Sequence, residues 1–429
     1  MAVALDDQIA KIVIWILYFV GLYFSLFWLS VLIFKPEENK KKKYKFEDLP
    51  EISIIMPMWN EEKNLEATIK SLFKLKYPLE KVHLFVVDDG STDNSYKIAK
   101  ELQKTFKFKL IKQENGGKHT AVNNALKLVK TPFFACLDVD GYVHKDSVRH
   151  IMEEFTDDNV AAVMPVMKVA ETKNMLQKVQ ELEYILNIFL KYIIGKLDCI
   201  HVTPGPLSTY RTHIVRDELG SFKQAHKTED LEMALRLQNK HYVLKQSLDA
   251  VIYTKVPETL KGFISQRTRW YHGTLLNVID YKHLLFNRHY GEFGFFYMPL
   301  VAVTGLLGFI GVLTVIYLFL KGVYHTIKRW FLTNFDFTTY ISSWSWNSTW
   351  IDYNYQTIFT SLVLFGLMFI FIYLSYFATN EKTGILRNIK ATFTFLYFFF
   401  VYKFIVAYIW LKVFYRVIFK KENKWNKDN

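Results

Sequence analysis

The chain has 429 residues and a formal net charge of +13, and 51% of its residues are apolar and 17% aromatic. This length allows one large domain or two ordinary ones. Apolar bulk combined with basic charge is typical of an integral membrane protein on an anionic leaflet. No zinc-finger, basic-zipper or RNA-binding signature is present, so we expect no nucleic-acid partner. The two cysteines, Cys136 and Cys199, show no metal-binding spacing and are expected to be buried in a protein of a reducing compartment.

The N-terminal part, residues 1–48, is predicted to be a transmembrane helix with a basic linker. The apolar run from Ile9 to Phe34 is long enough to span a bilayer. Asp6 and Asp7 stand where a signal peptide would be basic, and no small-residue cleavage site follows, so we expect a retained anchor. The linker is rich in lysine: Lys40, Lys41, Lys42, Lys43 and Lys45. The positive-inside rule places this end of the helix in the cytosol.

Residues 49–257 alternate between short β-branched runs and helix-like segments. The expected strands are Ile52–Trp59, His83–Asp88, Phe108–Gln113, Phe133–Asp138 and Val160–Val169. The expected helices lie near Glu61–Lys74, Asn94–Lys104, Lys118–Val129 and Asp146–Phe155. This alternation predicts an α/β domain with a doubly wound, mostly parallel sheet, which binds ligands at the carboxyl ends of its strands.

Two further helices are expected next to this domain. Thr172–Lys196 has apolar residues at three- and four-residue steps, so it lies either on the membrane surface or against the sheet. Thr259–Tyr281 forms most of an interfacial unit at 258–290.

The C-terminal part, 291–429, contains three more hydrophobic segments, Phe295–Leu320, Ile358–Phe377 and Ala391–Phe419. One helix before the α/β domain and three after it would put the tail outside the cell. The tail is nevertheless basic, with Lys420, Lys421, Lys424 and Lys427, which favours the cytosol. One segment is therefore a candidate for a re-entrant path. Lys403 lies near the middle of the last segment, which indicates a bundle interior or a polar path there.

Asp138-Val139-Asp140 follows an apolar strand, and Gly141 breaks that strand. Two carboxylates at a strand end are hard oxygen ligands of the kind that suits Mg²⁺ or Mn²⁺ bridged to a diphosphate. Taken alone, the pair could equally be solvated loop acids. Its place after a strand and the other polar motifs favour the metal site.

Two more motifs lie at strand ends. Asp88-Asp89 is followed by Gly90-Ser91, and an acid there can accept the imide N–H of uracil, although Asp and Gly are also ordinary turn residues. Asn115-Gly116-Gly117-Lys118 opens a helix, where glycines let backbone N–H groups approach a phosphate and Lys118 adds charge.

Thr228-Glu229-Asp230 begins a helix, with Thr228 as the expected cap. The helix dipole keeps a first-turn carboxylate ionised, which suits a base that deprotonates an acceptor hydroxyl. Ordinary first-turn capping is the alternative explanation.

Gln266-x-x-Arg269-Trp270 is expected on one helical face. Arg269 can bind diphosphate charge and Trp270 can stack on a sugar. A structural Trp with a snorkelling Arg is the alternative.

With these motifs, the chain resembles the family 2 inverting glycosyltransferases of the polysaccharide-synthase group, such as poly-N-acetylglucosamine, hyaluronan and cellulose synthases. Besides the motifs above, the resemblance includes Pro57-Met58-Trp59-Asn60-Glu61, Pro257–Gly262 and the run from Gly205 to Arg211. It covers roughly Ile52 to Leu276 and implies a GT-A-type catalytic domain inserted between transmembrane helices.

The resemblance also implies roles for residues. The donor would be bound by Pro57, Asn60, Glu61, Asp88, Asp89, Lys118 and Asp138. Asp138 and Asp140 would hold Mg²⁺ or Mn²⁺, and Asp230, with Glu229 beside it, would be the catalytic base. Gly205, Pro206, Gln266, Arg269 and Trp270 would contact the acceptor.

The expected function is that of a processive β-glycosyltransferase in the plasma membrane. It would have a cytosolic catalytic domain, use a UDP-sugar, with UDP-N-acetylglucosamine as the expected donor, and help to translocate the polysaccharide. Its partners would be the donor, the growing polysaccharide or a lipid acceptor, membrane lipids, and a small membrane protein or a second copy. Transfer of one sugar to a lipid, as by ceramide glucosyltransferases or polyprenyl-phosphate sugar synthases, stays open. A catalytically inactive receptor is a third reading, which the intact acids argue against.

Overall fold

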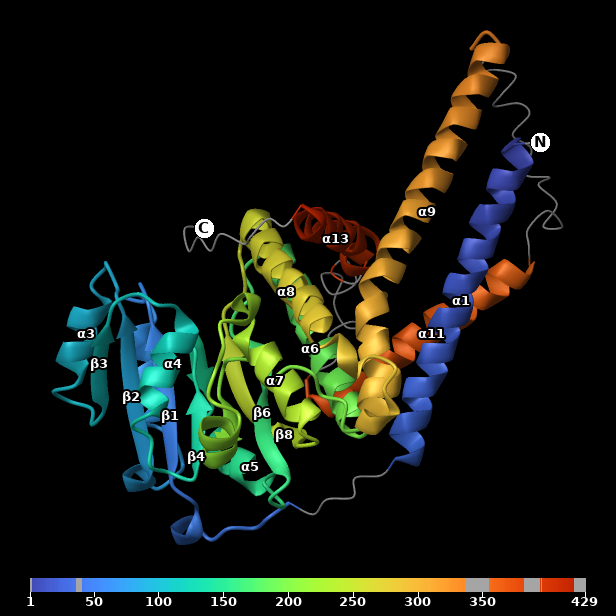
Figure 1. Ribbon diagram of the computed structural model, residues 1–429. Coiled ribbons are helices and arrows are strands. Elements are labelled where there is room, and N and C mark those ends of the chain that lie inside the picture. The colour runs from blue at the N-terminus through green and yellow to red at the C-terminus, as the bar shows by residue number, and fades with distance from the viewer. Residues whose placement is uncertain (1, 36–40, 336–354, 382–393, 395, 420–429) are drawn as a thin grey trace.

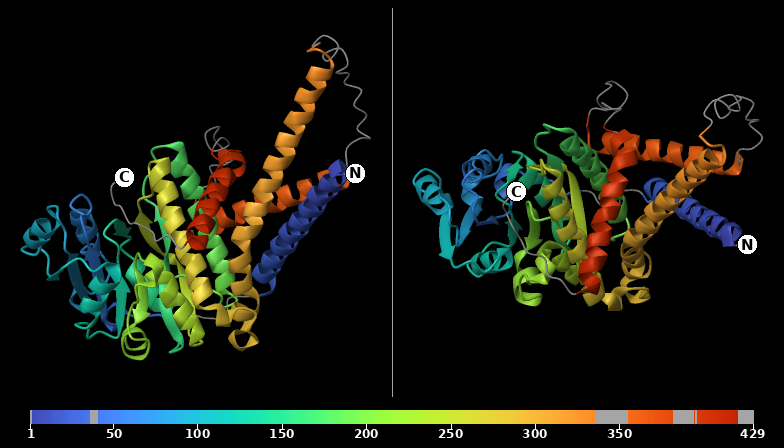
Figure 2. Two further views of the ribbon diagram at one scale, coloured as in Figure 1. Left: turned by 45° about the horizontal axis from the view of Figure 1, so that its top comes forward. Right: turned by 90° about the horizontal axis from the view of Figure 1, so that it is seen from above.

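The computed structural model describes residues 2–35, 41–335, 355–381, 394 and 396–419. Figure 1 shows a sheet domain on one side, long apolar helices on the other, and the helices α6 and α8 between them. The views in Figure 2 agree that α1, α9 and α11 extend away from the sheet on the side opposite β3.

An eight-stranded mixed sheet forms the centre of the domain, in the order β3-β2-β1-β4-β7-β6-β8-β5. The strands are β1 Ile52–Met58, β2 Val82–Asp89, β3 Lys109–Gln113, β4 Phe133–Cys136, β5 Gly141–Val143, β6 Val160–Val169, β7 Ser208–Arg211 and β8 Val243–Thr254. The β1 strand pairs in parallel with both β2 and β4, and β2 pairs in parallel with β3. This half of the sheet is the doubly wound arrangement that the sequence predicts.

Helices cover both faces of the sheet because successive β-strand side chains point to opposite faces. Ile54 belongs to the core formed with α2 (Leu65–Leu72), α3 (Ser95–Leu102) and α5 (Ser147–Glu153). Its neighbour Ile55 belongs to the core formed with α4 (Lys118–Leu126), α6 (Met175–Gly195) and α7 (Glu229–Asn239). Both residues are fully buried.

The other half of the sheet departs from the expected pattern. The β7 strand runs antiparallel to β4 and β6, and β5 runs antiparallel to β8. None of β5, β7 and β8 is expected from the sequence. The β8 strand lacks a clean apolar run, because Lys245, Gln246 and Asp249 interrupt it, and its register against β6 shifts between Ser247 and Val251.

The helices α6 and α8 (Leu260–Asp280) connect the sheet to the apolar helices. The α6 helix packs on β6 and β8 and also on α11, so it caps the sheet. The α8 helix packs on α13 (Lys403–Ile418), where the rings of Tyr271 and Trp410 stack 5.0 Å apart. The ring centre of Phe263, on α8, lies 5.6 Å from that of Tyr402, the residue before α13.

Three described helices are long and apolar enough to cross a membrane. They are α1 (Ala2–Phe34), the helical run Phe293–Leu332, which contains α9 (Met298–Leu332), and α11 (Tyr355–Ala378). They correspond to the first three segments expected from the sequence. Within the described residues α13 does not qualify, and it carries Lys403, Lys412 and Arg416. Part of the expected Ala391–Phe419 segment, Lys40 of the linker and all four tail lysines lie outside the described residues.

One end of each of these three helices contacts the sheet domain. At the end of α1, Lys196 Nζ donates to the Lys35 carbonyl oxygen at 3.0 Å. Just before α9, the Tyr297 hydroxyl lies 3.0 Å from Nδ1 of His201. After α11, Lys168 Nζ lies 2.9 Å from the Thr379 carbonyl oxygen and 2.8 Å from Glu381.

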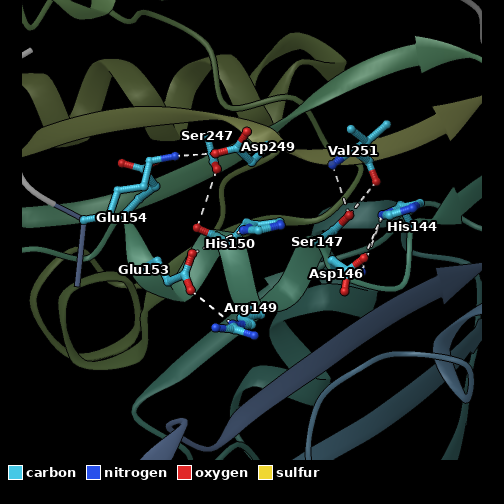
Figure 3. A network of polar contacts seen from close by, with 11 residues as sticks. His144, Asp146, Ser147, Arg149, His150, Glu153, Glu154, Ser247, Asp249 and Val251 are labelled. Carbon is cyan, nitrogen blue, oxygen red and sulfur yellow. Dashed lines mark hydrogen bonds and ion pairs between the residues drawn. The ribbon is translucent and has the colours of Figure 1, made fainter. Parts of the chain in front are cut away.

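The basic linker docks on the domain near α5 and β8. Lys41 Nζ lies 3.1 Å from Glu154 and 2.5 Å from Asp249. Figure 3 shows the surrounding network, in which the Ser147 hydroxyl donates to the Val251 carbonyl oxygen at 2.6 Å. Lys41 thus makes contacts with protein, in addition to the electrostatic role that the sequence predicts for the linker.

Candidate active site

The carboxyl ends of the parallel strands bring the first two acidic motifs to one edge of the sheet. Asp88 and Asp89 end β2, and Asp138 lies just beyond the end of β4. Between these strands lies β1, whose half-buried Pro57 pairs with Val87. The site therefore begins where open α/β sheets bind ligands.

Asp88 and Asp89 have different roles in the structure. Both oxygens of Asp89 accept bonds from the glycine loop: Gly116 N–H to Oδ1 and Gly117 N–H to Oδ2, each at 2.9 Å. Asp88 accepts a bond from the Ser91 N–H through Oδ1, at 3.2 Å. Its Oδ2 is buried and receives no hydrogen bond from the described residues. A buried carboxylate oxygen of this kind needs a donor, which a bound ligand can supply.

Asn60 and Glu61 fasten the turn after β1 to the turn after β2. Asn60 adopts a φ of 55° and accepts the Thr92 N–H through Oδ1 at 2.8 Å. The Glu61 N–H donates to the Ser95 hydroxyl at 2.7 Å, and the Glu61 carboxylate accepts from Asn64 at 2.9 Å. These contacts shape the edge of the site next to Asp88.

Lys118 joins two acidic motifs that are far apart in the sequence. Its Nζ lies 2.6 Å from Asp138 Oδ1 and 3.3 Å from Glu229 Oε1. A methyl group placed on Gly205 would lie 2.6 Å from Lys118 Nζ and 2.7 Å from Asp138 Oδ2. The Gly205-Pro206 loop therefore passes directly against this pair, and a larger residue at Gly205 would displace Lys118 or Asp138. The start of α4, the end of β4, this loop and the start of α7 meet at one point.

Negative charge exceeds positive charge at this point. Burial, together with the charges of Asp138 and Glu61, raises the pKa of Asp140 to about 7. Burial and the charge of Glu229 raise the pKa of Asp230 to about 6. Burial lowers the pKa of Lys118. The negative charges of Asp138, Glu229 and Asp230 have a larger opposite effect, so this pKa lies well above its usual value. Burial also raises the pKa of Glu229, but Lys118 and Arg269 more than reverse this and lower it.

This excess of carboxylate charge fits a divalent cation. Asp138 and Asp140 supply oxygen ligands of the hard type, although Asp138 is paired with Lys118. The described residues contain no group of three or more His, Cys, Asp or Glu arranged to hold a metal by themselves. The remaining ligands would come from a bound phosphate group and water, as is usual for Mg²⁺ sites of this kind.

The α8 helix rests directly on the Thr228-Glu229-Asp230 segment. Asn277 Nδ2 donates to Thr228 Oγ1 at 2.9 Å, and Arg269 donates to the Lys227 carbonyl oxygen at 3.0 Å. Thr228 occupies the N-cap position of α7, as the sequence predicts, but its side chain makes no capping hydrogen bond. Its hydroxyl instead donates to the Ala225 carbonyl oxygen at 3.1 Å, and it accepts the bond from α8.

Gln266 and Trp270 are held by a residue that the sequence motif leaves unspecified. Arg267 is 1% exposed, and its guanidinium carbon lies 4.2 Å from the centre of the Trp270 ring. It also donates to Gln266 Oε1 at 2.6 Å. Sequence reasoning missed Arg267 and its partner Glu183. A charged residue one helical turn before Trp270 could have indicated a contact between the two side chains.

The structure also adds Thr203 to the site. Its N–H and its hydroxyl both donate to the Asp230 carbonyl oxygen, at 3.4 and 2.7 Å. The Tyr210 hydroxyl donates to Thr203 Oγ1 at 2.9 Å. Thr203 thereby ties the Gly205-Pro206 loop to the first turn of α7. No motif in the sequence pointed to it.

Known proteins resemble this chain in sequence and in fold. Glycosyl transferase family 2 matches residues 53–217. The poly-beta-1,6-N-acetyl-D-glucosamine synthase of Staphylococcus aureus (strain COL) is 28% identical over 267 residues, which are 60% of this chain and 64% of that protein. The protein of the same name from Staphylococcus epidermidis is 27% identical over the same shares. The match thus spans a little under two thirds of these relatives.

Among solved structures, the mannosyltransferase PcManGT from Pyrobaculum calidifontis, in complex with GDP-Man and Mn²⁺, aligns with a TM-score of 0.64. The alignment covers 97% of this chain and 99% of that one at 16% sequence identity. At this identity the likeness shows the fold, which extends over the sheet domain and the apolar helices.

Proposed function

We propose that this chain, which carries a family 2 glycosyl transferase domain, is a processive membrane-embedded β-glycosyltransferase that polymerises a UDP-sugar, with UDP-N-acetylglucosamine as the donor. The name of the two staphylococcal relatives, which contains N-acetyl-D-glucosamine, supports this choice of donor. The observation that carries the proposal is the meeting of Asp138, Lys118 and Glu229 at distances of 2.6 and 3.3 Å, with Asp230 beside them.

The donor would bind across the carboxyl ends of β1, β2 and β4. The free oxygen of Asp88 accepts the imide N–H of uracil, whereas Asp89 is used to hold the glycine loop. Pro57, Asn60 and Glu61 form the neighbouring wall. Lys118 contributes positive charge to the diphosphate, since a lysine acts there as a point charge.

Asp138 and Asp140 would hold Mg²⁺ or Mn²⁺ against the diphosphate. A divalent cation at this position neutralises charge on the leaving UDP. Burial and the charges of Asp138 and Glu61 raise the pKa of Asp140, and a bound cation would offset both effects and keep the carboxylate ionised.

Asp230 would be the catalytic base. Its carboxylate takes the proton of the acceptor hydroxyl as that oxygen attacks the anomeric carbon, and the bond from this carbon to the diphosphate oxygen breaks. The new bond forms on the opposite face, so the product is β-linked. Glu229 stays ionised beside Lys118, and its charge keeps the pKa of Asp230 high enough for proton transfer near neutral pH.

The acceptor would lie between the Gly205-Pro206 loop and α8. Trp270 supplies a stacking surface for its terminal sugar, Gln266 donates a hydrogen bond, and Arg269 faces the diphosphate. A chain leaving this site would enter the membrane beside α8. Since the described part offers three candidate spans, we expect a small membrane protein or a second copy to complete a translocation path.

We propose that the sheet domain, 49–257, and the end of α13 both lie in the cytosol. The lysine linker supports a cytosolic domain. Three crossings by α1, α9 and α11 return the chain to the domain side, where Lys168 contacts Thr379 and α13 packs on α8. This removes the conflict between four spans and a basic tail.

Cysteine labelling tests this topology, because the chain has two cysteines and both are buried. Asn334→Cys, after α9, should react with an impermeant maleimide on intact cells. Phe419→Cys, which is exposed after α13, should react only after permeabilisation. Labelling of both positions on intact cells would contradict three crossings.

The activity is tested with detergent-purified protein, Mn²⁺ and each radiolabelled UDP-sugar, with and without added lipid. A high-mass product from UDP-N-acetylglucosamine is expected. A product with a single sugar on lipid would show that the protein is a lipid glycosyltransferase and not a polymerase. Absence of turnover with every metal would refute the proposal that it is an enzyme. Asp230→Asn should abolish transfer and keep UDP binding, and transfer by this variant would remove Asp230 as the base.

A further inference from the structure

Arg267 is a buried cation in the middle of the proposed acceptor helix. Its side chain is 1% exposed and is among the largest fully buried side chains of the described structure. Nη2 donates to Glu183 Oε2 at 2.7 Å, which joins α8 to α6. A charge at such a position requires a partner, because an unpaired buried ion is costly.

The flat face of the Arg267 guanidinium is surrounded by aromatic rings. Its central carbon lies 4.2 Å from the ring centre of Trp270, 4.9 Å from that of Phe263 and 5.9 Å from that of Tyr184. A guanidinium over an aromatic face is attracted by the ring quadrupole, most strongly for Trp. The contact therefore covers one face of Trp270 and restricts the rotation of its ring.

The same guanidinium orients Gln266. Nη1 of Arg267 donates to Gln266 Oε1 at 2.6 Å. An arginine side chain carries donors and no acceptor, so the amide atom that faces it must be the oxygen. The amide oxygen of Gln266 is thus turned toward Arg267, and its two N–H donors are turned away. Gln266 is half-buried, so these donors are available to an oxygen of a ligand.

We propose that the Glu183–Arg267 ion pair is a positioning element for the acceptor: it fixes the plane of Trp270 and presents Gln266 as a hydrogen-bond donor to an acceptor-sugar oxygen. Neither residue of the pair touches the substrate. This inference rests on the proposed function of Trp270 and Gln266, and it adds the reason why they are preorganised. Trp270 also packs on Val169, Tyr184 and Val256, so the pair would act on one face of a ring that is otherwise supported.

The test separates acceptor use from donor use. Purified full-length protein receives UDP-N-acetylglucosamine, Mn²⁺ and a short β-linked N-acetylglucosamine oligosaccharide, and both elongation and hydrolysis of the donor by water are measured. Glu183→Gln and Arg267→Lys should raise the KM for the oligosaccharide about tenfold and leave the rate of donor hydrolysis within about twofold. Equal losses in both reactions would mean that the pair only supports the fold.

A mutant cycle then tests whether the pair acts through Trp270 and Gln266. In a Gln266→Ala, Trp270→Ala background, Glu183→Gln should change the KM for the oligosaccharide by less than about twofold, because both groups that the pair positions are gone. A full tenfold effect in that background would overturn the proposal.

Arg236→Lys is the matched control. Arg236 forms another buried pair, with Glu232 at 2.7 Å, but this pair lies within α7 and contacts no tryptophan in the described part of the chain. It should alter stability without an acceptor-specific change in KM. If the wild type elongates nothing with any donor, the proposed function fails, whereas elongation with an unchanged KM in Arg267→Lys refutes only the role of the pair.

Discussion

Replacing Gly273 by alanine should separate two helices that the proposed mechanism needs in contact. Gly273 lies on α8 against Thr228, the residue before α7. A methyl group at Gly273 would lie 2.4 Å from Thr228 Oγ1 and 2.5 Å from its Cγ2. Non-bonded carbon atoms prefer about 3.5–4.0 Å, so α8 and the start of α7 must move apart by about 1 Å.

The effects on stability and on turnover should differ in size. Overpacking costs about 1–3 kcal/mol, but alanine is favoured over glycine inside a helix by about 1 kcal/mol, so the net loss of stability should be small. A 1 Å shift in a catalytic arrangement can reduce turnover about a hundredfold. The bonds from Asn277 to Thr228, now 2.9 Å, and from Arg269 to the Lys227 carbonyl, now 3.0 Å, would both be strained.

The assay is UDP release by purified Gly273→Ala, together with its midpoint of thermal unfolding. Gly308→Ala is the control, since it also lies in a helix and, among the described residues, no atom outside its own helical turn lies within 4 Å of the added methyl group. We expect a loss of about a hundredfold for the first variant and none for the second. Turnover of Gly273→Ala within about twofold of the wild type would refute the idea that the contact of α8 with Thr228 aligns the site.

Three other predictions concern charge. Because the pKa of Asp230 is raised to about 6, kcat/KM at saturating Mn²⁺ should fall about tenfold per pH unit below pH 6, and a flat profile down to pH 5 would exclude Asp230 as the base. The same shift stabilises the fold below the unfolded pKa of 3.8, and this contribution is lost as the pH rises through 6. Lys118→Met should weaken UDP binding about tenfold or more in calorimetry with Mn²⁺, because a charge-assisted contact is lost, and unchanged affinity would remove Lys118 from the donor site. Lys41→Ala should lower the midpoint of unfolding by no more than about 4 °C, since this lysine is 38% exposed and Asp249 58%, and a larger drop would show that the linker is a structural part of the domain.

The parallel half of the sheet could be predicted from sequence because its strands are buried on both faces. Residues Ile52–Met58 form a nearly continuous apolar run, and the same holds for Leu84–Val87 in the middle of β2. The β8 strand escaped detection because several of its residues are half-buried or exposed and a register shift interrupts its alternation. β7 is four residues long, and its pairing with β4 and β6 depends on contacts distant in the chain.

The acidic motifs could be placed at the sheet edge by sequence alone, but their individual states could not. Asp88 and Asp89 are adjacent and chemically identical. Asp89 accepts hydrogen bonds from Gly116 and Gly117, whereas Asp88 keeps one oxygen without a partner among the described residues. That difference arises from the path of a loop 27 residues later in the chain. No local pattern in the sequence reports it.

Contacts between helices explain why the base and the acceptor motif act as one unit. Thr228 resembles a helix cap in sequence, because threonine before two acids is a common N-terminal pattern. In the fold its hydroxyl is taken by Asn277, and the space beside it is filled by the backbone at Gly273. Contacts with α8 therefore position the segment that contains Asp230, in place of a side-chain cap on α7 itself. Since α8 also packs on α13, a movement of α8 relative to α7 would displace the base through Thr228. A site assembled in this way couples the proposed chemistry to the helices that would guide the product, which is what a processive enzyme requires.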